Sequence, residues 1–432
     1  MASNMQKDSS KTNFTKDDED SASKNKQSWR ILSVIQCASI PALPIVFFSD
    51  SLQKSVGIFD FIIALILGVI LFWIVCSSVV LLGSAEKLNT TQIFERHFGG
   101  LGKYSISLIL LFCLSIWSAI EITEHSKAIL NVINTYGRMT LGTEEIMVCQ
   151  VFLLLLGFLF CLLGINGLAR IGLICLIYIV FFIVLTISFY HEAPDLPVRS
   201  FSFPGFRIAF CSVISMLMVV PIDLPNFFKY SITKKDSLIG LGIFAVSIVL
   251  IEIAGIFLLN KINKIREIVP EEIIQTNGVI ALLLTVFLVL VCAFVVAINI
   301  FSASVAIETF YPGFTYKKRI QVTGFFTLLT TVVYFFYREV ILNLSDYFDS
   351  MLILISITLC VIFLRPNFFS VKTNFAAWLL GCITIGCLHF KMFKLDIEPL
   401  IAGLIVLFIC LIIFYFMFYS FSSIKGKKPD LL

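Results

Sequence analysis

Asp223 lies between two prolines inside an apolar stretch, a combination that could bind a solute or an ion within a membrane. Residues 216–230 read MLMVVPIDLPNFFKY, and Pro221 and Pro225 each remove a backbone N–H and disfavour helix at the residue before them. A carboxylate at membrane depth is disfavoured by roughly 2.5–3.5 kcal/mol or more. A broken helix is tolerated there when it lines a cavity, so we expect Val220 and Asp223 to border a binding site. The alternative is that Asp223 caps a helix end within the break.

Prolines interrupt a second apolar span, near the N-terminus. Residues 37–44 read CASIPALP, where Ser39 and Ile40 precede Pro41 and Pro44. One early and one central Pro-interrupted span indicate a binding site at the interface of two inverted repeats. The two spans are the first and the sixth of the chain, and this odd offset means that they cross the membrane in opposite directions. We therefore expect both breaks to enclose the bound solute.

A third group of polar residues follows a helical period. Trp117, Glu121 and Glu124 recur at i, i+4 and i+7, which places them on one face of a helix. An aromatic plate beside a carboxylate acceptor suits a flat heterocycle that bears N–H groups. The alternative is that residues 121–127 are simply the polar outer end of the span, with Glu124 paired to Lys127.

Two further apolar spans each contain isolated polar residues. Asn299, with Ser302 and Ser304, lies in one of them and could bind either a neighbouring helix or a ligand. Glu252 lies in the other, either as a protonation site or as half of an interhelical pair. Burial favours the protonated form of a carboxyl group. The acids that could carry a transported proton are Glu121, Asp223 and Glu252.

The composition excludes most other classes of protein. Of the 432 residues, 59% are hydrophobic and 14% charged, and the mean hydropathy is +0.98, which indicates an all-α polytopic membrane protein. A net charge of +4 without a basic face does not indicate nucleic-acid binding. The 12 cysteines lie in or beside apolar spans without a C-x-x-C pair, so we expect neither disulfides nor a metal site. H-E-x-x-H and G-x-S-x-G motifs are absent, and we expect no enzyme activity and no cofactor.

Twelve transmembrane helices are predicted from the apolar runs. The excess of Lys and Arg in alternate loops and in both tails favours cytoplasmic termini in a multi-pass protein of the plasma (inner) membrane. We expect a disordered tail at 1–28, a ten-helix core at 29–365, two additional helices at 366–421 and a second cytoplasmic tail at 422–432. The predicted spans are 30–49, 57–82, 104–134, 146–165, 168–190, 206–230, 237–260, 277–310, 320–337, 341–364, 374–390 and 398–421. Residues 90–99, between the second and third spans, are predicted to form a short interfacial helix.

Three stretches resemble the nucleobase–cation symporter-1 permeases, a family that includes cytosine, purine, allantoin and hydantoin transporters. They are LPNFFKY at 224–230 with KDSLIG at 235–240, KLNTTQIFERHFG at 87–99, and NIFSASVAIETFYP at 299–312. The resemblance implies five-plus-five inverted repeats with broken helices one and six, two added helices, and alternating access.

The resemblance also implies roles for individual residues. The family's helix-three Trp stacks on the substrate and a Gln or Glu four residues later bonds its edge, which matches Trp117 and Glu121. An Asn on helix eight contacts substrate and matches Asn299. The chain departs from the family in lacking an aromatic residue at 216–220 and in carrying Asn226 where the signature has an acid.

The resemblance bears on the driving ion as well. In the family that the chain resembles, sodium-coupled members hold the ion with a Ser/Thr pair on helix eight. The matching positions are Ala293 and Phe294, or Ala297 and Ile298 in a register shifted by four residues. Neither pair supplies a hydroxyl ligand, so we expect proton coupling or uniport.

The expected function is uptake of a small planar nitrogen heterocycle such as a nucleobase. One rival is an amino-acid or amine permease on the same scaffold, in which the broken helices offer dipole ends to a carboxylate and Glu121 binds an ammonium. A second rival is a membrane sensor that binds solute without moving it. The sequence does not indicate an oligomeric state.

Overall fold

The computed structural model describes residues 26–40, 52, 54–137, 142–189, 200–268, 278–364, 370–390 and 399–424. Within these ranges the chain is helical, and the β-structure there is one isolated bridge between Gln27 and Ser231. In chain order the helices are α2 (Trp29–Cys37), α4 (Ile58–Glu86), α5 (Thr90–Gly137), α6 (Thr143–Leu162), α7 (Gly164–Phe189), α8 (Phe203–Leu217), η1 (Val220–Ile222), α9 (Pro225–Phe228), α10 (Lys234–Ile268), α12 (Gly278–Phe310), α13 (Tyr316–Phe336), α14 (Arg338–Leu364), α15 (Val371–His389) and α16 (Pro399–Ile424).

These helices agree with the predicted membrane spans. Ten helical segments in the described ranges are long and apolar enough to cross a membrane, and they correspond to the second to eleventh predicted spans. Phe203–Phe228, which contains α8, η1 and α9, is one of the ten. α2 and α16 overlap the first and twelfth predicted spans.

The sixth span is broken where the prolines predicted. α8 ends at Leu217, a single 3-10 turn covers Val220–Ile222, and α9 begins at Pro225. Pro221 and Pro225 occupy the first turns of these two short helices, where a missing N–H leaves no hydrogen bond unmade. The Ser356 hydroxyl of α14 donates to the Met218 carbonyl at 3.0 Å, so a neighbouring helix satisfies one of the freed backbone groups.

The first span ends its helix just before its prolines. α2 stops at Cys37, and Ala38–Ile40 form a turn in which the Ser39 hydroxyl donates to the Gln36 carbonyl at 2.7 Å. Ile40 is buried. Pro41 and Pro44, the predicted helix breaks, lie outside the described residues.

The predicted short helix at 90–99 is separated from the third span by a kink. Thr90–Gly137 carries one label, α5, but its backbone is non-helical at Gly99 with φ +75°. This conformation favours glycine, and it lets the chain change direction without leaving a loop. The predicted end of the short helix at Gly99 is therefore confirmed.

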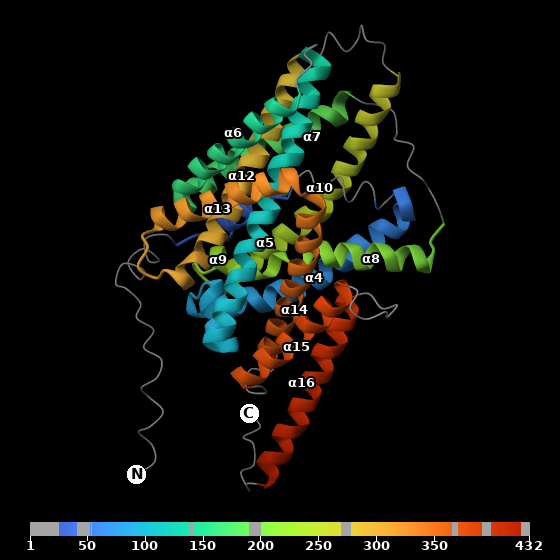
Figure 1. The fold of residues 1–432 in the computed structure, drawn as a ribbon. Helices are drawn as coiled ribbons and strands as arrows, with labels where there is room; N and C mark the ends of the chain where they lie inside the picture. The colour runs from blue at the N-terminus through green and yellow to red at the C-terminus, as the bar shows by residue number, and fades with distance from the viewer. Residues whose placement is uncertain are drawn as a thin grey trace.

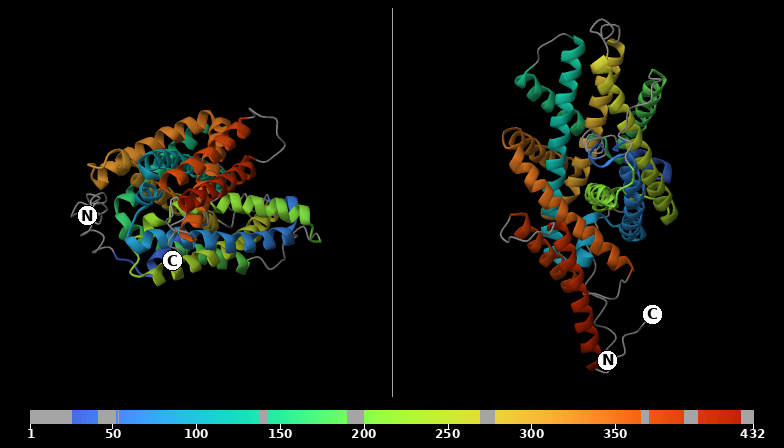
Figure 2. Two further views of the ribbon diagram at one scale, coloured as in Figure 1. Left: turned by 90° about the horizontal axis from the view of Figure 1, so that it is seen from below. Right: turned by 90° about the vertical axis from the view of Figure 1, so that its right-hand side faces the viewer.

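α5 and α12 form the centre of the molecule (Figures 1 and 2). They pack along each other more extensively than any other pair of helices in the described part of the chain. Small residues permit such close approach within membranes. At Gly157 of α6, an added methyl group would lie 3.0 Å from the Ala293 carbonyl of α12, so this contact requires glycine.

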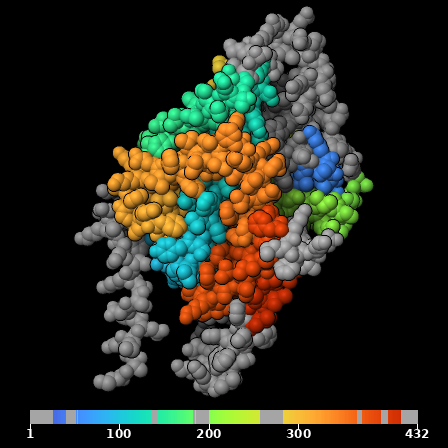
Figure 3. Space-filling view, in the orientation of Figure 1, coloured from blue at the N-terminus to red at the C-terminus, as the bar shows by residue number. Residues whose placement is uncertain are grey.

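The two C-terminal helices pack beside the tenth span. On the face drawn in Figure 3, α13 and α14 (orange) and α15 (red) surround α5 (cyan). Trp378 of α15 packs edge-on against Phe98 of α5, and Asn374 donates to the His97 carbonyl at 3.1 Å. α16 lies against α15 and extends away from the other helices in Figure 1. The division into a core and two added helices stays a prediction.

A bridge of backbone hydrogen bonds joins the segment before α2 to the chain after α9. The Gln27 N–H donates to the Tyr230 carbonyl at 2.7 Å, and the Ile232 N–H donates to the Gln27 carbonyl at 3.0 Å. The Gln27 side chain donates to Asn166 of α7 at 2.6 Å. Lys87, after α4, donates to the Ser231 carbonyl. We call this set the Gln27 bridge, and it ties the first, second, fifth and sixth spans together.

Candidate substrate site

Trp117 is held by its edge against the tenth span. Its indole Nε1 donates to Asp349 Oδ1 of α14 at 3.1 Å, and the Cys113 thiol, one turn earlier on α5, donates to the same oxygen at 3.0 Å. Because Nε1–H lies in the plane of the ring, this bond holds the indole by its edge. Trp117 is only partly buried, as a stacking residue must be.

Asp223 lies in the helix break with neutral neighbours. Its Oδ1 accepts from the Asn226 side-chain amide at 3.2 Å. The first residues of α9 receive no side-chain cap, so the alternative role as a helix cap is not supported. The hydroxyl of Ser302, on α12, faces this carboxylate, yet it is completely buried and makes no hydrogen bond of normal geometry.

The helix break lies in the same region as Trp117, Cys113 and Asp349, a group that we call the Trp117 wall. Cys113 lies within electrostatic range of both Asp349 and Asp223. η1 packs against α4 and α14, and Ile222 belongs to the same apolar cluster as Trp117 and Leu110. The structure therefore brings together Trp117 and Asp223, which were predicted, with Asp349, which was not.

Glu121 lies one turn along α5 from Trp117, in a second polar cluster. Its Oε2 is 3.3 Å from Nδ1 of His125, and both side chains are buried. Nδ1 also lies 2.9 Å from the Glu121 carbonyl, which can only accept, so Nδ1 carries the hydrogen and Nε2 is the basic nitrogen. Glu121 Oε2 and His125 Nε2 make no hydrogen bond. The Cys292 thiol of α12 donates to the Glu121 carbonyl at 3.8 Å.

The alternative interpretation of residues 121–127 is correct for the outer half of the group. Glu124 pairs with Lys127 at 3.0 Å and with Arg338 at 3.4 Å, and all three side chains are partly exposed. Glu121, by contrast, is 2% exposed. The third span thus passes from a buried carboxyl to a solvated ion-pair cluster within one helical turn.

The remaining predicted site residues lie at separate places. Asn299 is partly exposed on α12, one turn before Ser302, and shares its face of the helix. Val220 begins η1 and is partly buried. Glu252 is completely buried on α10, a helix that packs mainly against α4 and α2. That placement separates Glu252 from the Trp117 wall.

Sequence reasoning missed Asp349 and Gln36. Asp349 lies near the middle of a 27-residue helix, directly before its long apolar half, and an acid at that depth was a signal of the kind that identified Asp223. Gln36 is buried at the end of α2, next to the first break, and its side-chain nitrogen makes no hydrogen bond. It too was a polar residue beside a predicted break.

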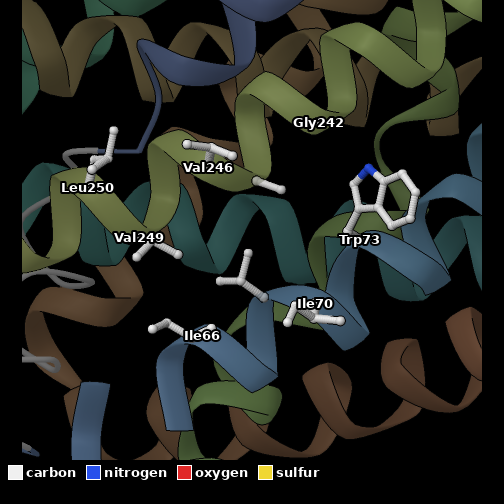
Figure 4. A pocket seen from close by; sticks show the side chains of 9 residues that line it. Ile66, Ile70, Trp73, Gly242, Val246, Val249 and Leu250 are labelled. Carbon is white, nitrogen blue, oxygen red and sulfur yellow. The ribbon is translucent and has the colours of Figure 1, made fainter. Parts of the chain in front are cut away.

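A groove between α4 and α10 is distinct from this site. Figure 4 shows side chains of α4 and α10 on opposite walls, with the Trp73 indole at one end. The lining is almost entirely apolar, and Ile70 and Val246 are exposed on the outer surface. Such a groove suits lipid chains and offers nothing to orient a polar solute.

The positions matched to a sodium site are filled by apolar side chains. Ala293 and Phe294 of α12 are completely buried. A methyl group at Gly172 of α7 would lie 2.9 Å from Phe294 Cζ and 3.4 Å from Val34 of α2, so the phenyl ring occupies the junction of α2, α7 and α12. No cluster of three or more His, Cys, Asp and Glu side chains that could hold a metal occurs within the described ranges.

The arrangement of helices is similar to that of several solved membrane transporters. Mhp1, a nucleobase-cation-symport-1 family transporter solved with bromovinylhydantoin bound, matches with a TM-score of 0.61 at 13% identity, over 93% of this chain and 94% of that one. A Na⁺-coupled sialic acid symporter matches with a TM-score of 0.65 at 13% identity, over 91% and 90%. A manganese transporter from Eremococcus coleocola matches with a TM-score of 0.53 at 12% identity, over 92% and 95%.

These likenesses establish the fold of the chain. It is an all-α, multi-pass membrane protein with the five-plus-five transporter fold, and the resemblance inferred from the sequence is confirmed at the level of fold. No protein-family model and no curated protein sequence matches the chain.

Proposed function

We propose that the protein is a secondary active transporter of a small planar nitrogen heterocycle, with a nucleobase or a close relative as its substrate. The observation that carries this proposal is the edge-held indole of Trp117 beside the broken sixth span. A flat ring stacks on the face of the indole, and hydrogen-bonding groups at the ring's edge meet the polar walls formed by α14 and the break. Asn299 and Gln36 are further contacts in this proposal.

The amino-acid rival fits the site less well. The fold offers helix ends to a substrate carboxylate, but here Asp223 lies within the break and would repel it. An amine has no carboxylate for Asp223 to repel, so an amine permease is the stronger version of this rival. A sensor that binds without transport would share the site and differ only in lacking net movement.

Uptake into proteoliposomes tests the proposal against its rivals. We expect accumulation of a labelled nucleobase that other nucleobases inhibit and that amino acids do not. Inhibition by amino acids alone would replace the proposal with the permease rival. Binding without accumulation would indicate a sensor.

We further propose that the driving ion is the proton. The Phe294 ring fills the junction where hydroxyl ligands for sodium would be needed, and the buried Glu121–His125 pair can hold a proton away from water. Asp223 and Glu252 are the other buried acids that could take part. Proton loading at Glu121, one turn from Trp117, would be coupled to the site through α5.

We place both termini in the cytoplasm of a plasma (inner) membrane protein, as the Lys/Arg distribution indicates. A cysteine introduced near Leu432 should resist an impermeant thiol reagent applied to sealed cells and react after permeabilisation. Reaction in sealed cells would contradict this orientation.

A further inference from the structure

Among the residues that the structure describes, no basic side chain contacts the two carboxylates of the candidate site. The groups that contact Asp349 are the Trp117 indole, the Cys113 thiol and, at 3.5 Å, the Ser345 hydroxyl. Those that contact Asp223 are Asn226 and Ser302. All of these groups are neutral.

Three more exposed acids in the described part of the chain are paired with cations. Arg96 binds Glu86, Lys103 binds Glu95 and Arg319 binds Glu308. Unpaired acids at membrane depth are disfavoured and mark substrate or ion pathways. The contrast indicates that the charge missing at Asp349 and Asp223 is supplied by something that enters the site.

Three observations besides the acids point to a ligand. The Ser302 hydroxyl is 0% exposed and faces Asp223, and no other partner for it is found among the described residues. The second carboxylate oxygen of Asp349 has only the long Ser345 contact. The edge of the Trp117 indole, the aromatic ring that best attracts cations, binds Asp349.

We propose that the bound solute is a planar cation, such as an amidinium or a protonated amino-heterocycle, recognised by Asp349 and Asp223 and stacked on Trp117. This inference rests on the proposed function and names the charge class of its substrate. A flat cation with N–H donors at its edges satisfies a carboxylate in the plane of the ring and the indole above it. A neutral ring of the same shape leaves both acids unpaired, and an anion is repelled.

Three isosteric probes that differ in charge test the inference on the purified full-length protein at neutral pH. Benzamidine is cationic, benzamide neutral and benzoate anionic, and their dissociation constants are measured by calorimetry. We expect benzamidine to bind about tenfold or more tightly than benzamide, because a charge-assisted hydrogen bond is roughly twice as strong as a neutral one. Benzoate should not bind.

The Asp349→Asn variant separates the effect of the Asp349 charge from the effect of Asp349 on the orientation of Trp117. The amide oxygen can still accept from Trp117 and Cys113, so the ring keeps its orientation while the charge is removed. We expect Asp349→Asn and Asp223→Asn each to reduce the preference for benzamidine and to leave benzamide unchanged. Glu124→Gln, in the solvated ion-pair cluster, is the matched control and should keep the preference.

The possible outcomes distinguish failure of the cationic inference from failure of the proposed function. Equal binding of benzamidine and benzamide, or a preference that survives both Asn variants, overturns the cationic inference. If a neutral nucleobase binds and Trp117→Ala abolishes that binding, the proposed function stands even then. If no planar probe and no nucleobase binds a monodisperse, folded protein, both proposals fail.

Discussion

Replacing Trp117 with alanine should weaken binding of the substrate about 5- to 150-fold, which corresponds to roughly 1–3 kcal/mol. The substitution removes the stacking plate, and it also removes the donor that holds Asp349 in place. Trp117→Phe keeps an aromatic face and loses only the Nε1 hydrogen bond, so its effect should be intermediate. Equilibrium binding of a labelled nucleobase to the purified variants measures the changes.

Trp73→Ala is the matched control for this prediction. Trp73 lies in the apolar groove between α4 and α10, outside the candidate site, so its removal should leave affinity unchanged (Figure 4). If the Trp117 and Trp73 variants bind equally well, the indole wall is not the substrate site. A Trp117→Ala protein that fails to fold would be judged by Trp117→Phe instead.

A pH gradient should drive accumulation in proteoliposomes that contain no sodium, whereas a sodium gradient at fixed pH should not. The junction of α2, α7 and α12 is filled by the Phe294 ring, and Ala293 offers no side-chain oxygen. A sodium ion needs oxygen ligands to replace its water. The buried Glu121 carboxyl, 3.3 Å from His125, offers a place for a proton instead.

The Glu121→Gln variant tests whether Glu121 is the residue that carries the coupled proton. The variant keeps the shape of the side chain and cannot release a proton, so it should exchange substrate across the membrane without concentrating it in response to pH. Glu124→Gln, three residues away in a partly exposed ion pair, should behave like the unmodified protein. Sodium-driven accumulation with no response to the pH gradient would contradict the proposal.

The fold could be predicted from the sequence because the bilayer imposes simple rules. Apolar length located the spans, and Pro221 and Pro225 located the break, since a missing N–H has the same consequence in any context. The end of the short helix at 90–99 was also predicted. It falls at Gly99, where a positive φ separates this helix from the third span.

The site was predictable only in part, because side-chain partners come from distant spans. Helical spacing put Trp117, Glu121 and Glu124 on one face, but their environments differ: Asp349 binds the first, His125 lies beside the second and Lys127 pairs with the third. The separation in sequence between Trp117 and Asp349 carries no periodic signal. Only the packing of α14 against α5 reveals that pair.

In the proposed transport cycle, the Gln27 bridge is a candidate local-unfolding step. Separating the segment before α2 from the chain after α9 would break the two backbone hydrogen bonds of Gln27, and moving Gln27 away from α7 would break its side-chain bond to Asn166. Openings of this kind expose amides to solvent exchange, each with its own free energy. If this bridge opens during the proposed cycle, the Gln27 and Ile232 amides exchange with solvent only through that opening, so their exchange rate gives a lower limit on how often the bridge opens.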